Sequence, residues 1–326
     1  GTIHKKNGKI QNPGMIYLHR YLRLIPLYII TLLFFWYLMS SVGTGPIYFL
    51  YYQYKAKNCE DTWWVHWLFL NNIVEIKSNA SDCMGWTWYL PNDMQFFLLI
   101  PLLVYLIYKR RTLGFIFIGV YQSICFIITM INCIQYKLSP SYFEATDEYY
   151  PYYYHRPWAR IAPFTIGVVL AVMLYSFKNE TPEQSRLKRI MDVIDSNKWV
   201  RYSMYIIGAV LFWGMIFIFY PINNHPEDFG KVFNYFFLTF SKGFFVIGMS
   251  CVLLPCLMGH NWPVRWFLSL DIFTPFARLT FGAYMVHPTF MLFDAYNAVT
   301  GTYLTINLGI TKYICLLVVA FTTSLL

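Results

Sequence analysis

Two arginines open a long apolar run in the stretch His19-Arg20-Tyr21-Leu22-Arg23-Leu24-Ile25-Pro26, which continues from Leu27 to Met39. At roughly 1.5 Å per residue, this run is long enough to cross a bilayer as a helix. A spacing of three residues places both guanidinium groups on one side of that helix, near its beginning. Each group could bind phosphate oxygens bidentately, so the pair could hold a phosphorylated ligand at the membrane surface. The simpler interpretation is that they anchor the helix on its cytosolic side, and these two residues alone favour it.

The composition is that of a membrane protein. The 326 residues are 57% hydrophobic, 21% aromatic and 13% charged, whereas charged residues make up about a quarter of a soluble domain. The apolar residues come in long blocks, which predict eight helical spans, several of them short or interrupted by proline. These spans cover residues 22–42, 94–108, 112–134, 160–177, 202–220, 232–258, 274–292 and 305–326. The expected fold class is an all-α, polytopic integral-membrane helix bundle, with residues 1–326 forming a single domain that is itself a fragment of a longer protein.

The basic residues predict the orientation of this bundle. If residues 1–23 are cytosolic, the cytosolic segments hold 16 lysines and arginines and the opposite side holds 7, while Lys242 and Lys312 fall inside spans. This skew fits the preference for positive charge on the cytosolic side. The net charge of +9 therefore follows from topology. No basic stripe interleaved with aromatics predicts a nucleic-acid partner, and we expect membrane lipids and other membrane proteins as partners instead.

The cysteines predict an oxidising compartment. Cys59 and Cys83 lie in the loop 43–93, which is expected to be lumenal or extracellular and which also carries the glycosylation sequon Asn79-Ala80-Ser81. The other five cysteines lie in apolar spans, where a thiol usually behaves as a small hydrophobic group. We favour a disulfide between Cys59 and Cys83 over two free thiols, and a glycan on Asn79. The expected location is a membrane of the eukaryotic secretory pathway, either the endoplasmic reticulum or the plasma membrane.

Polar residues cluster at the head of the second span. Asp93 and Gln95 follow Trp88 and Tyr89 at the point where the helix is expected to enter the bilayer. Polar side chains at membrane depth usually face a cavity or one another. For Asp93 an equally good alternative is that it satisfies free amide groups at the helix N-terminus.

Two further clusters lie later in the chain. Arg160 opens the fourth span within His155-Arg156-Pro157-Trp158-Ala159-Arg160, where it could also be an interfacial anchor. His287 lies inside an otherwise apolar segment, three residues after Tyr284 and directly before Pro288, which we expect to break the helix. A lone buried histidine is more often structural than catalytic, but the proline and the tyrosine make this one a candidate.

The order of these motifs resembles one branch of a known family. The motifs are Arg-x-x-Arg-x-x-Pro from Arg20, Cys59…Trp63-Trp64…Asn71-Asn72…Cys83, Trp88-Tyr89-Leu90-Pro91-Asn92-Asp93-Met94-Gln95-Phe96, Arg156-Pro157-Trp158-Ala159-Arg160, and Arg278-Leu279-Thr280-Phe281…Tyr284…His287-Pro288. Spread over residues 14–290, this series resembles the nose-resistant-to-fluoxetine branch of the acyltransferase-3 family. No single motif is decisive, but five in the same order are specific.

The resemblance implies an integral-membrane enzyme that moves an acyl group, often acetyl, from acyl-coenzyme A to a hydroxyl of a lipid, sugar or other acceptor. In the wider family the paired arginines are thought to engage the coenzyme A phosphates, which maps onto Arg20 and Arg23. The family's essential histidine of the first span has no match here and is expected upstream of Gly1. The sequence also departs from the family at Asp93 and Gln95, where bacterial relatives usually have Glu, and at Lys242, where relatives tend to have Arg followed by Trp.

Acyl transfer needs a base for the acceptor hydroxyl and donors for the developing oxyanion. The acid–base candidates are Asp93 and His287. The residues expected to bind acyl-coenzyme A and its acyl group are Arg20, Arg23, Trp88, Tyr89, Gln95 and Arg160. The resemblance implies acyl-coenzyme A as the donor substrate. No Ser-His-Asp arrangement and no metal-ligand spacing is present, so we expect neither a covalently bound cofactor nor a metal. Two alternatives stay open: a carrier of lipids or small hydrophobic molecules, and a non-catalytic subunit of a membrane assembly.

Overall fold

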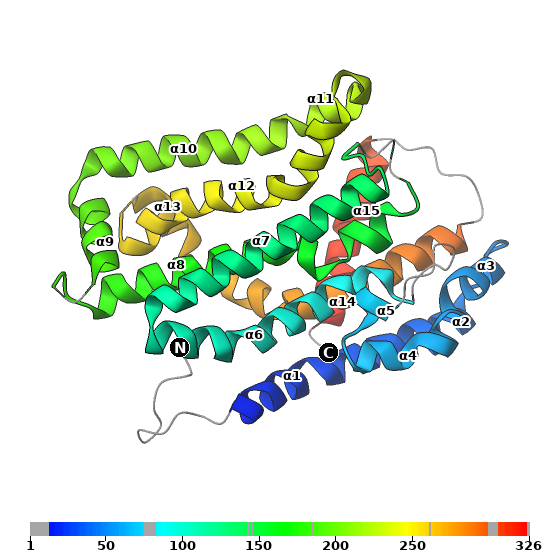
Figure 1. Cartoon of the computed structure of the whole chain (residues 1–326). Helices are drawn as coiled ribbons and strands as arrows, with labels where there is room; N and C mark the ends of the chain where they lie inside the picture. The colour runs from blue at the N-terminus through cyan, green and yellow to red at the C-terminus, as the bar shows by residue number, and fades with distance from the viewer. Residues whose placement is uncertain are drawn as a thin grey trace. The chain divides into compact units, whose positions relative to one another are not determined.

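The computed structural model describes residues 13–74, 83–141, 144, 146–183, 185–260, 262–298 and 306–324. Throughout these residues the regular elements are helices (Figure 1). Six of the described helices are long and apolar enough to cross a membrane. The prediction of an all-α, polytopic membrane fold is therefore confirmed.

The helices form two compact units. Unit 1 consists of Gly1–Leu102 and Asp271–Leu326, and unit 2 of Leu103–Leu270. The division falls inside one helix, α6 (Tyr89–Lys109). The other elements of unit 1 are α1 (Pro13–Leu33), η1 (Phe34–Leu38), α2 (Met39–Val42), α3 (Phe49–Tyr51), η2 (Tyr52–Ala56), α4 (Cys59–Trp67), α5 (Asn71–Val74), η3 (Gly85–Trp88), α14 (Phe273–Asn297) and α15 (Ile306–Thr323).

Unit 2 contains the remaining helices and the aromatic segment between α7 and α8. Its elements are α7 (Arg111–Gln135), η5 (Tyr150–Tyr154), η6 (Pro157–Ala159), α8 (Ile161–Asn179), α9 (Arg186–Ser196), α10 (Lys198–Phe217), α11 (Phe219–Asn224), η7 (Pro226–Asp228), α12 (Lys231–Met258) and α13 (Trp262–Leu268). The first six predicted spans coincide with the six long apolar helices. The last two predicted spans are also helical, as α14 and α15, but they lie outside that set of six.

The segment between the first two spans is more structured than a connecting loop. Instead of extending away from the bundle, its helices pack against α1, and Tyr21 on α1 donates a hydrogen bond from its hydroxyl to Trp67 O (3.2 Å). Further along α1, the ring of Phe35 meets that of Tyr51, whose hydroxyl donates to Phe35 O (2.9 Å). These aromatic residues form the main apolar core of unit 1. The segment is thus part of the folded core, since aromatic side chains supply most of the buried area here.

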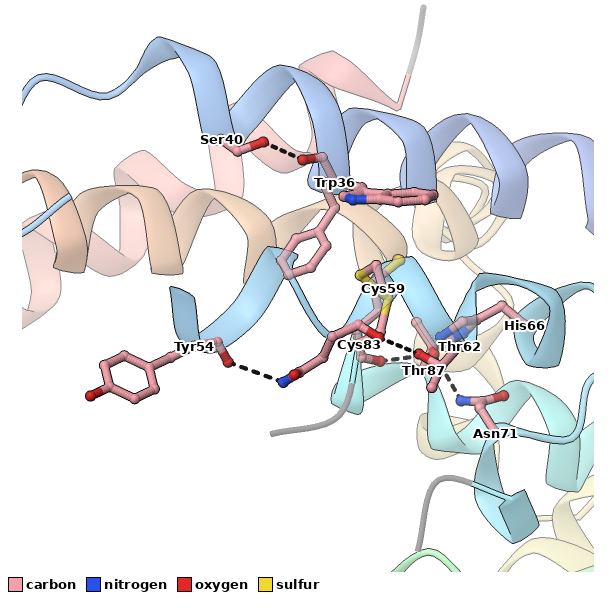
Figure 2. The surroundings of a disulfide bond; sticks show 12 residues. Trp36, Ser40, Tyr54, Cys59, Thr62, His66, Asn71, Cys83 and Thr87 are labelled. Carbon is pink, nitrogen blue, oxygen red and sulfur yellow. Dashed lines mark hydrogen bonds between the residues drawn. A yellow bond between two sulfur atoms is a disulfide. The ribbon is translucent and has the colours of Figure 1, made fainter. Parts of the chain in front are cut away.

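A disulfide fixes this core. Cys59 and Cys83 are bonded, as predicted, and both are buried against the aromatic cluster (Figure 2). The bond joins the beginning of α4 to the turn that precedes η3. The predicted glycosylation site, Asn79, lies outside the described residues.

In unit 2, α10 and α12 run side by side (Figure 1), and Gly208 and Gly248 face each other between them. A Cβ atom on Gly208 would lie 2.8 Å from Gly248 O, and a Cβ atom on Gly248 would lie 2.9 Å from the Cβ of Leu211. Both distances are too short for a real side chain. Small residues let helix backbones approach closely in membrane proteins, where packing rather than water exclusion drives association. The two glycines therefore set the distance between these helices.

Candidate functional site

The first polar group of unit 1 joins α1 to α6. Arg20 on α1 forms an ion pair with Asp93 on α6, and its guanidinium carbon lies 4.1 Å from the centre of the Phe97 ring. The two charged side chains are partly buried, at 30% and 34% exposure. The pairing decides between the two roles considered for Asp93. Its carboxylate meets Arg20 and does not cap α6, which begins four residues earlier at Tyr89.

This ion pair corrects the expected depths of its two members. From the sequence, Arg20 was expected at the cytosolic end of its span and Asp93 at the opposite membrane face. A direct contact excludes that arrangement. The stretch of α6 from Asp93 to Lys109 is roughly 24 Å long at 1.5 Å per residue, so the pair lies well away from that end of the helix. The physical reason is that α6 begins at Tyr89, earlier than predicted, and runs back alongside α1.

The two arginines of the first motif have different surroundings. Arg23 is exposed, and it makes no ion pair with a described residue. Arg20 is engaged by Asp93, but its Nε atom is buried and has no hydrogen-bond partner in the part of the chain that is described. Arg23 therefore has its whole guanidinium group available to a ligand, whereas Arg20 has one buried donor to satisfy.

Three amide side chains, one on α5 and two on α6, form a second group. Asn72 donates to Asn92 Oδ1 (2.8 Å) and to Gln95 Oε1 (3.0 Å). In return, Gln95 Nε2 donates to Asn72 Oδ1 (2.9 Å) and to Phe69 O (3.2 Å). Both amide hydrogens of Gln95 are thus used inside the protein. The arrangement holds α5 against the first turns of α6.

A third group is fully buried and was not predicted from the sequence. The hydroxyl of Tyr28 on α1 lies 2.7 Å from His66 Nδ1 and 2.8 Å from Thr87 Oγ1. Asn71 donates to the same Thr87 oxygen (3.2 Å). Tyr28 is 1% exposed, and His66 and Thr87 are fully buried. Figure 2 shows His66, Asn71 and Thr87 near the disulfide, so the covalent bond and the polar network stabilise the same region.

The sequence indicated only part of this hydrogen-bonded network. Asn71 and its neighbour Asn72 belong to a motif of the sequence, yet nothing in that motif identifies their partners. Tyr28 and His66 are separated by 38 positions, and Tyr28 and Thr87 by 59. Only the packing of α4 and η3 against α1 brings these side chains together.

The fourth group lies on α14. Tyr284 donates from its hydroxyl to Trp86 O (2.5 Å), and Trp86 Nε1 donates to Met285 O (3.3 Å). His287 Nδ1 lies 3.0 Å from Ala283 O. Because a carbonyl oxygen can only accept, Nδ1 carries the proton, and a neutral ring then has its lone pair on Nε2. Among the described residues, no group hydrogen-bonds to that Nε2 atom.

The expectation that Pro288 breaks this helix is wrong. α14 continues through Pro288 to Asn297. A proline removes one backbone donor, but buried neighbours on both sides, Met285 and Thr289, hold the two turns in the core of unit 1. His287 is therefore fixed on a continuous helix.

Aromatic contacts connect the fourth group to the turn of α6 that carries the ion pair. The ring of Tyr89 lies 6.1 Å from Trp88 and 6.5 Å from Tyr284, and Tyr284 lies 6.3 Å from the His287 ring. Tyr89 precedes Asp93 by one helical turn, so the two lie on the same side of α6. Unit 1 thus contains one continuous series of side chains from Arg20 to His287.

Unit 2 contains a different cluster, in which basic side chains lie on tyrosine rings. The Lys242 ammonium lies 3.9 Å from the centre of the Tyr153 ring and donates to Ala159 O (3.1 Å). The Arg160 guanidinium lies 4.2 Å from the Tyr154 ring, and its Nε donates to Tyr154 O (3.0 Å). We refer to Lys242, Arg160 and these two tyrosines as the cation–tyrosine cluster.

His155 borders the cation–tyrosine cluster. Its pKa is lowered to about 4, first by burial and then by the nearby charges of Arg160 and Arg156. Both effects disfavour the protonated ring. At neutral pH this histidine is therefore an uncharged side chain.

Comparison with known proteins identifies the family. A profile described as an acyltransferase domain, that of the acyltransferase-3 family, matches residues 9–326. The chain belongs to the acyltransferase-3 family. It is 31% identical over 295 residues to "nose resistant to fluoxetine protein 6" of Caenorhabditis elegans. That alignment covers 87% of this chain and 34% of the relative, so the chain spans about a third of the relative's length. No solved structure matches it.

Membership of the acyltransferase-3 family confirms the resemblance seen in the motifs and suggests membrane acyltransferase activity. In this acyltransferase-3 chain, unit 1 contains seven of the candidate site residues: Arg20, Arg23, Trp88, Tyr89, Asp93, Gln95 and His287. Arg160 belongs to unit 2. Among the described residues, no group of three or more His, Cys, Asp and Glu side chains could hold a metal ion.

Proposed function

We propose that the chain is the membrane part of an O-acyltransferase that moves an acyl group, acetyl in the simplest case, from acyl-coenzyme A to a hydroxyl of a lipid, sugar or other acceptor. One observation carries the proposal beyond family membership. In unit 1, an arginine with one unsatisfied donor, Arg20, and a histidine with a free Nε2 lie on one series of neighbouring side chains. The proposed compartment is the endoplasmic reticulum or the plasma membrane.

The donor would be recognised by its phosphates. Arg23 is exposed and has no carboxylate partner among the described residues, which supports a role in binding an anion from solution. The Arg20 side chain is 30% exposed beside Asp93, which supports a second contact to the same ligand. An arginine fork matches phosphate oxygens bidentately, so two such groups would fix the donor's orientation as well as hold it.

His287 is the preferred general base. Its Nδ1–H is held by Ala283 O, so the ring keeps one orientation and presents Nε2 as the proton acceptor. Asp93 is less suited to this role because its carboxylate is already engaged by Arg20. Asp93 would instead position Arg20.

The reaction can be written with every atom assigned. His287 Nε2 takes the proton of the acceptor hydroxyl while that oxygen attacks the thioester carbonyl carbon. The carbonyl oxygen becomes an oxyanion, the carbon–sulfur bond breaks, and the leaving thiolate takes the proton back from the imidazolium. The products are an ester of the acceptor and free coenzyme A. No covalent acyl-enzyme is needed, because the thioester is already activated.

Donors for the oxyanion would come from the aromatic side of the series. Tyr89 is 55% exposed and lies one turn from Asp93, which leaves its hydroxyl accessible to substrate. Trp88 stands beside it. Gln95 is a poor oxyanion donor since both of its amide hydrogens are used by Asn72 and Phe69, and we assign it a positioning role in place of the donor role expected from the sequence.

The test uses the full-length protein in lipid with radiolabelled acetyl-coenzyme A. We expect Arg23→Ala to weaken binding at least tenfold, and His287→Gln to bind normally but to lose label transfer to lipid or soluble acceptors. Arg186→Ala removes an exposed arginine of unit 2 and serves as the matched control. If the intact protein binds no coenzyme A, the proposal is wrong, and a carrier or a non-catalytic subunit becomes the better description.

A further inference from the structure

A pocket of about 590 Å³ lies in unit 1, and none of the residues proposed for acyl transfer lines it. It is lined by Trp36, Tyr37, Ser40, Ser41, Tyr52 and Glu60. Along α1 and η1, Trp36 lies roughly 24 Å from Arg20 at 1.5 Å per residue. The pocket therefore shares no lining residue with the series from Arg20 to His287 and is a site of its own.

The pocket is built on two unusual turns of the backbone. Trp36 and Tyr37 belong to the π-helical segment η1, and Tyr52 belongs to a second one, η2. The two segments contact each other. π-helical turns are rare and occur frequently at functional sites, because the extra residue turns side chains away from the direction that an α-helix would give them. Two such turns line this one pocket, which indicates a functional site.

The polar groups of the pocket are arranged to accept hydrogen bonds. The hydroxyl of Tyr52 donates to Glu60 Oε1 (2.6 Å). Ser41 donates to Tyr37 O (3.0 Å), and Ser40 donates to the same carbonyl (3.0 Å) and to Trp36 O. Since these hydroxyl protons are used inside the protein, the oxygens have only lone pairs left for a ligand. The second carboxylate oxygen of Glu60 is a further acceptor.

The charge of the pocket is negative and uncompensated. Glu60 is the one charged residue of its lining, and no lysine or arginine among the described residues forms an ion pair with it. Its neighbour Cys59 is held by the disulfide, so the first turn of α4 is fixed in place. The hydrogen bond to Glu60 also raises the pKa of Tyr52, which keeps the phenol protonated and bonded to the carboxylate.

Three aromatic side chains complete the lining. Trp36 and Tyr37 stack with their ring centres 4.5 Å apart, and Tyr52 stands on the neighbouring segment. Aromatic rings near the end of a membrane span often serve as an interfacial belt. A belt does not explain a carboxylate and several acceptor oxygens gathered among the rings. Rings together with an anion are the arrangement that recognises organic ammonium groups, through cation–π attraction and charge.

We propose that this pocket binds an organic ammonium group, supplied either by a lipid headgroup or by a free water-soluble amine. Aromatic faces of Trp36, Tyr37 and Tyr52 would surround the methylene or methyl groups next to the nitrogen. Glu60 would supply the opposite charge, and the serine oxygens would accept from N–H or polarised C–H groups. The proposal does not depend on acyl transfer, because the site is remote from Arg20 and binding needs no acyl-coenzyme A.

The test measures choline binding to the full-length protein in nanodiscs, without acyl-coenzyme A. We compare choline with 3,3-dimethyl-1-butanol, which has the same shape and no charge, and expect the alcohol to bind at least tenfold more weakly. Glu60→Gln and Trp36→Ala should each weaken choline binding at least tenfold. Tyr52→Phe should retain binding, because it keeps the ring and the carboxylate. Glu183→Gln and Trp63→Ala remove an exposed acid and an exposed tryptophan outside the pocket and serve as controls.

The lipid of the nanodisc distinguishes the two sources. If a lipid headgroup is the natural occupant, phosphatidylcholine discs will compete with free choline and lower its apparent affinity relative to phosphatidylglycerol discs at high salt. If the occupant is a free amine, the two discs will give the same affinity. Equal binding of choline and its uncharged analogue, or unchanged binding by the folded Glu60→Gln protein, overturns the proposal. So does a lack of choline binding in phosphatidylglycerol discs.

Discussion

Unit 1 and unit 2 both place polar and charged side chains among aromatic rings, but they stabilise them in different ways. In unit 1, the charge of Arg20 is balanced by Asp93, and the buried residues around Tyr28 form a neutral hydrogen-bonded network. In unit 2, Lys242 and Arg160 lie on tyrosine rings and donate to backbone carbonyls. The first solution pairs polar side chains with one another, whereas the second uses the rings and carbonyls of one short segment, which Lys242 contacts from 83 positions away.

The difference predicts which region tolerates change. Removing one member of a hydrogen-bonded or ionic pair leaves the other unpaired, and an unpaired polar group away from water is costly. Removing Lys242 or Arg160 leaves a ring and a backbone carbonyl oxygen, but no unpaired charge. We therefore expect the polar groups of unit 1 to be sensitive to substitution and the cation–tyrosine cluster to be tolerant, apart from its response to acid.

Loss of the disulfide is expected to have the largest effect, confined to unit 1. Cys59 and Cys83 are 24 positions apart, and closing a loop of that size stabilises a protein by roughly 3.5 kcal/mol through the chain entropy of the unfolded state. Hydrogen exchange of a Cys59→Ser, Cys83→Ser variant should show faster exchange in α1 and α4. Amides of α10 and α12 should keep their protection. Equal loss in both units would show that the regions are not independent.

Acid should destabilise unit 2 through His155. Its pKa is lowered to about 4 in the folded protein, whereas the ordinary value is about 6.5. Between these values the unfolded chain binds more protons, so stability is fully present above pH 6.5 and is lost as the pH falls towards 4. The loss amounts to at most about 3 kcal/mol. Thermal unfolding followed across this range should show a shallower pH dependence in His155→Gln, and an unchanged dependence would assign the effect to other groups.

Tyr28→Phe should break the neutral network of unit 1. The substitution removes the hydroxyl that contacts both His66 and Thr87, and leaving buried polar atoms without this partner costs about 2 kcal/mol. Tyr21→Phe is the matched control, because its hydroxyl makes a single, more exposed bond to Trp67 O. We expect a clear decrease in melting temperature for the first variant and a small one for the second. Equal decreases would mean that loss of a hydroxyl, and not of the network, is being measured.

The smallest expected effect is the difference in stability loss between two variants that each lack one cation. Arg20→Met leaves Asp93 unpaired and partly buried, which we expect to cost about 1–2 kcal/mol. Lys242→Met leaves no acid behind and should change stability by less than about 1 kcal/mol. Chemical denaturation of both variants in the same detergent measures the difference. A larger loss for Lys242→Met would contradict the distinction between the two regions.

The sequence predicted the large features of this molecule because they depend on local composition. Long apolar blocks such as 112–134 correspond closely to helices such as α7, since a helix in lipid must satisfy its own backbone. Cys59 and Cys83 could be paired because the other cysteines lie in apolar spans. The pairing of Arg20 with Asp93 could not be predicted, since a segment expected to be an extramembrane loop packs against α1. For the same reason the sequence indicated polar residues such as Asn71 without indicating what they contact.

Gly208 and Gly248 have a further consequence for how this protein can vary. Much of α10 is covered by exposed apolar side chains, including Ile206, Val210 and Trp213. Most of its positions can therefore exchange one apolar residue for another with little loss of stability. At the two glycines a single methyl group would push the helix axes apart along their whole length. The surface of unit 2 that should tolerate substitution best and the position that should tolerate it least therefore lie on the same helix, only a turn apart.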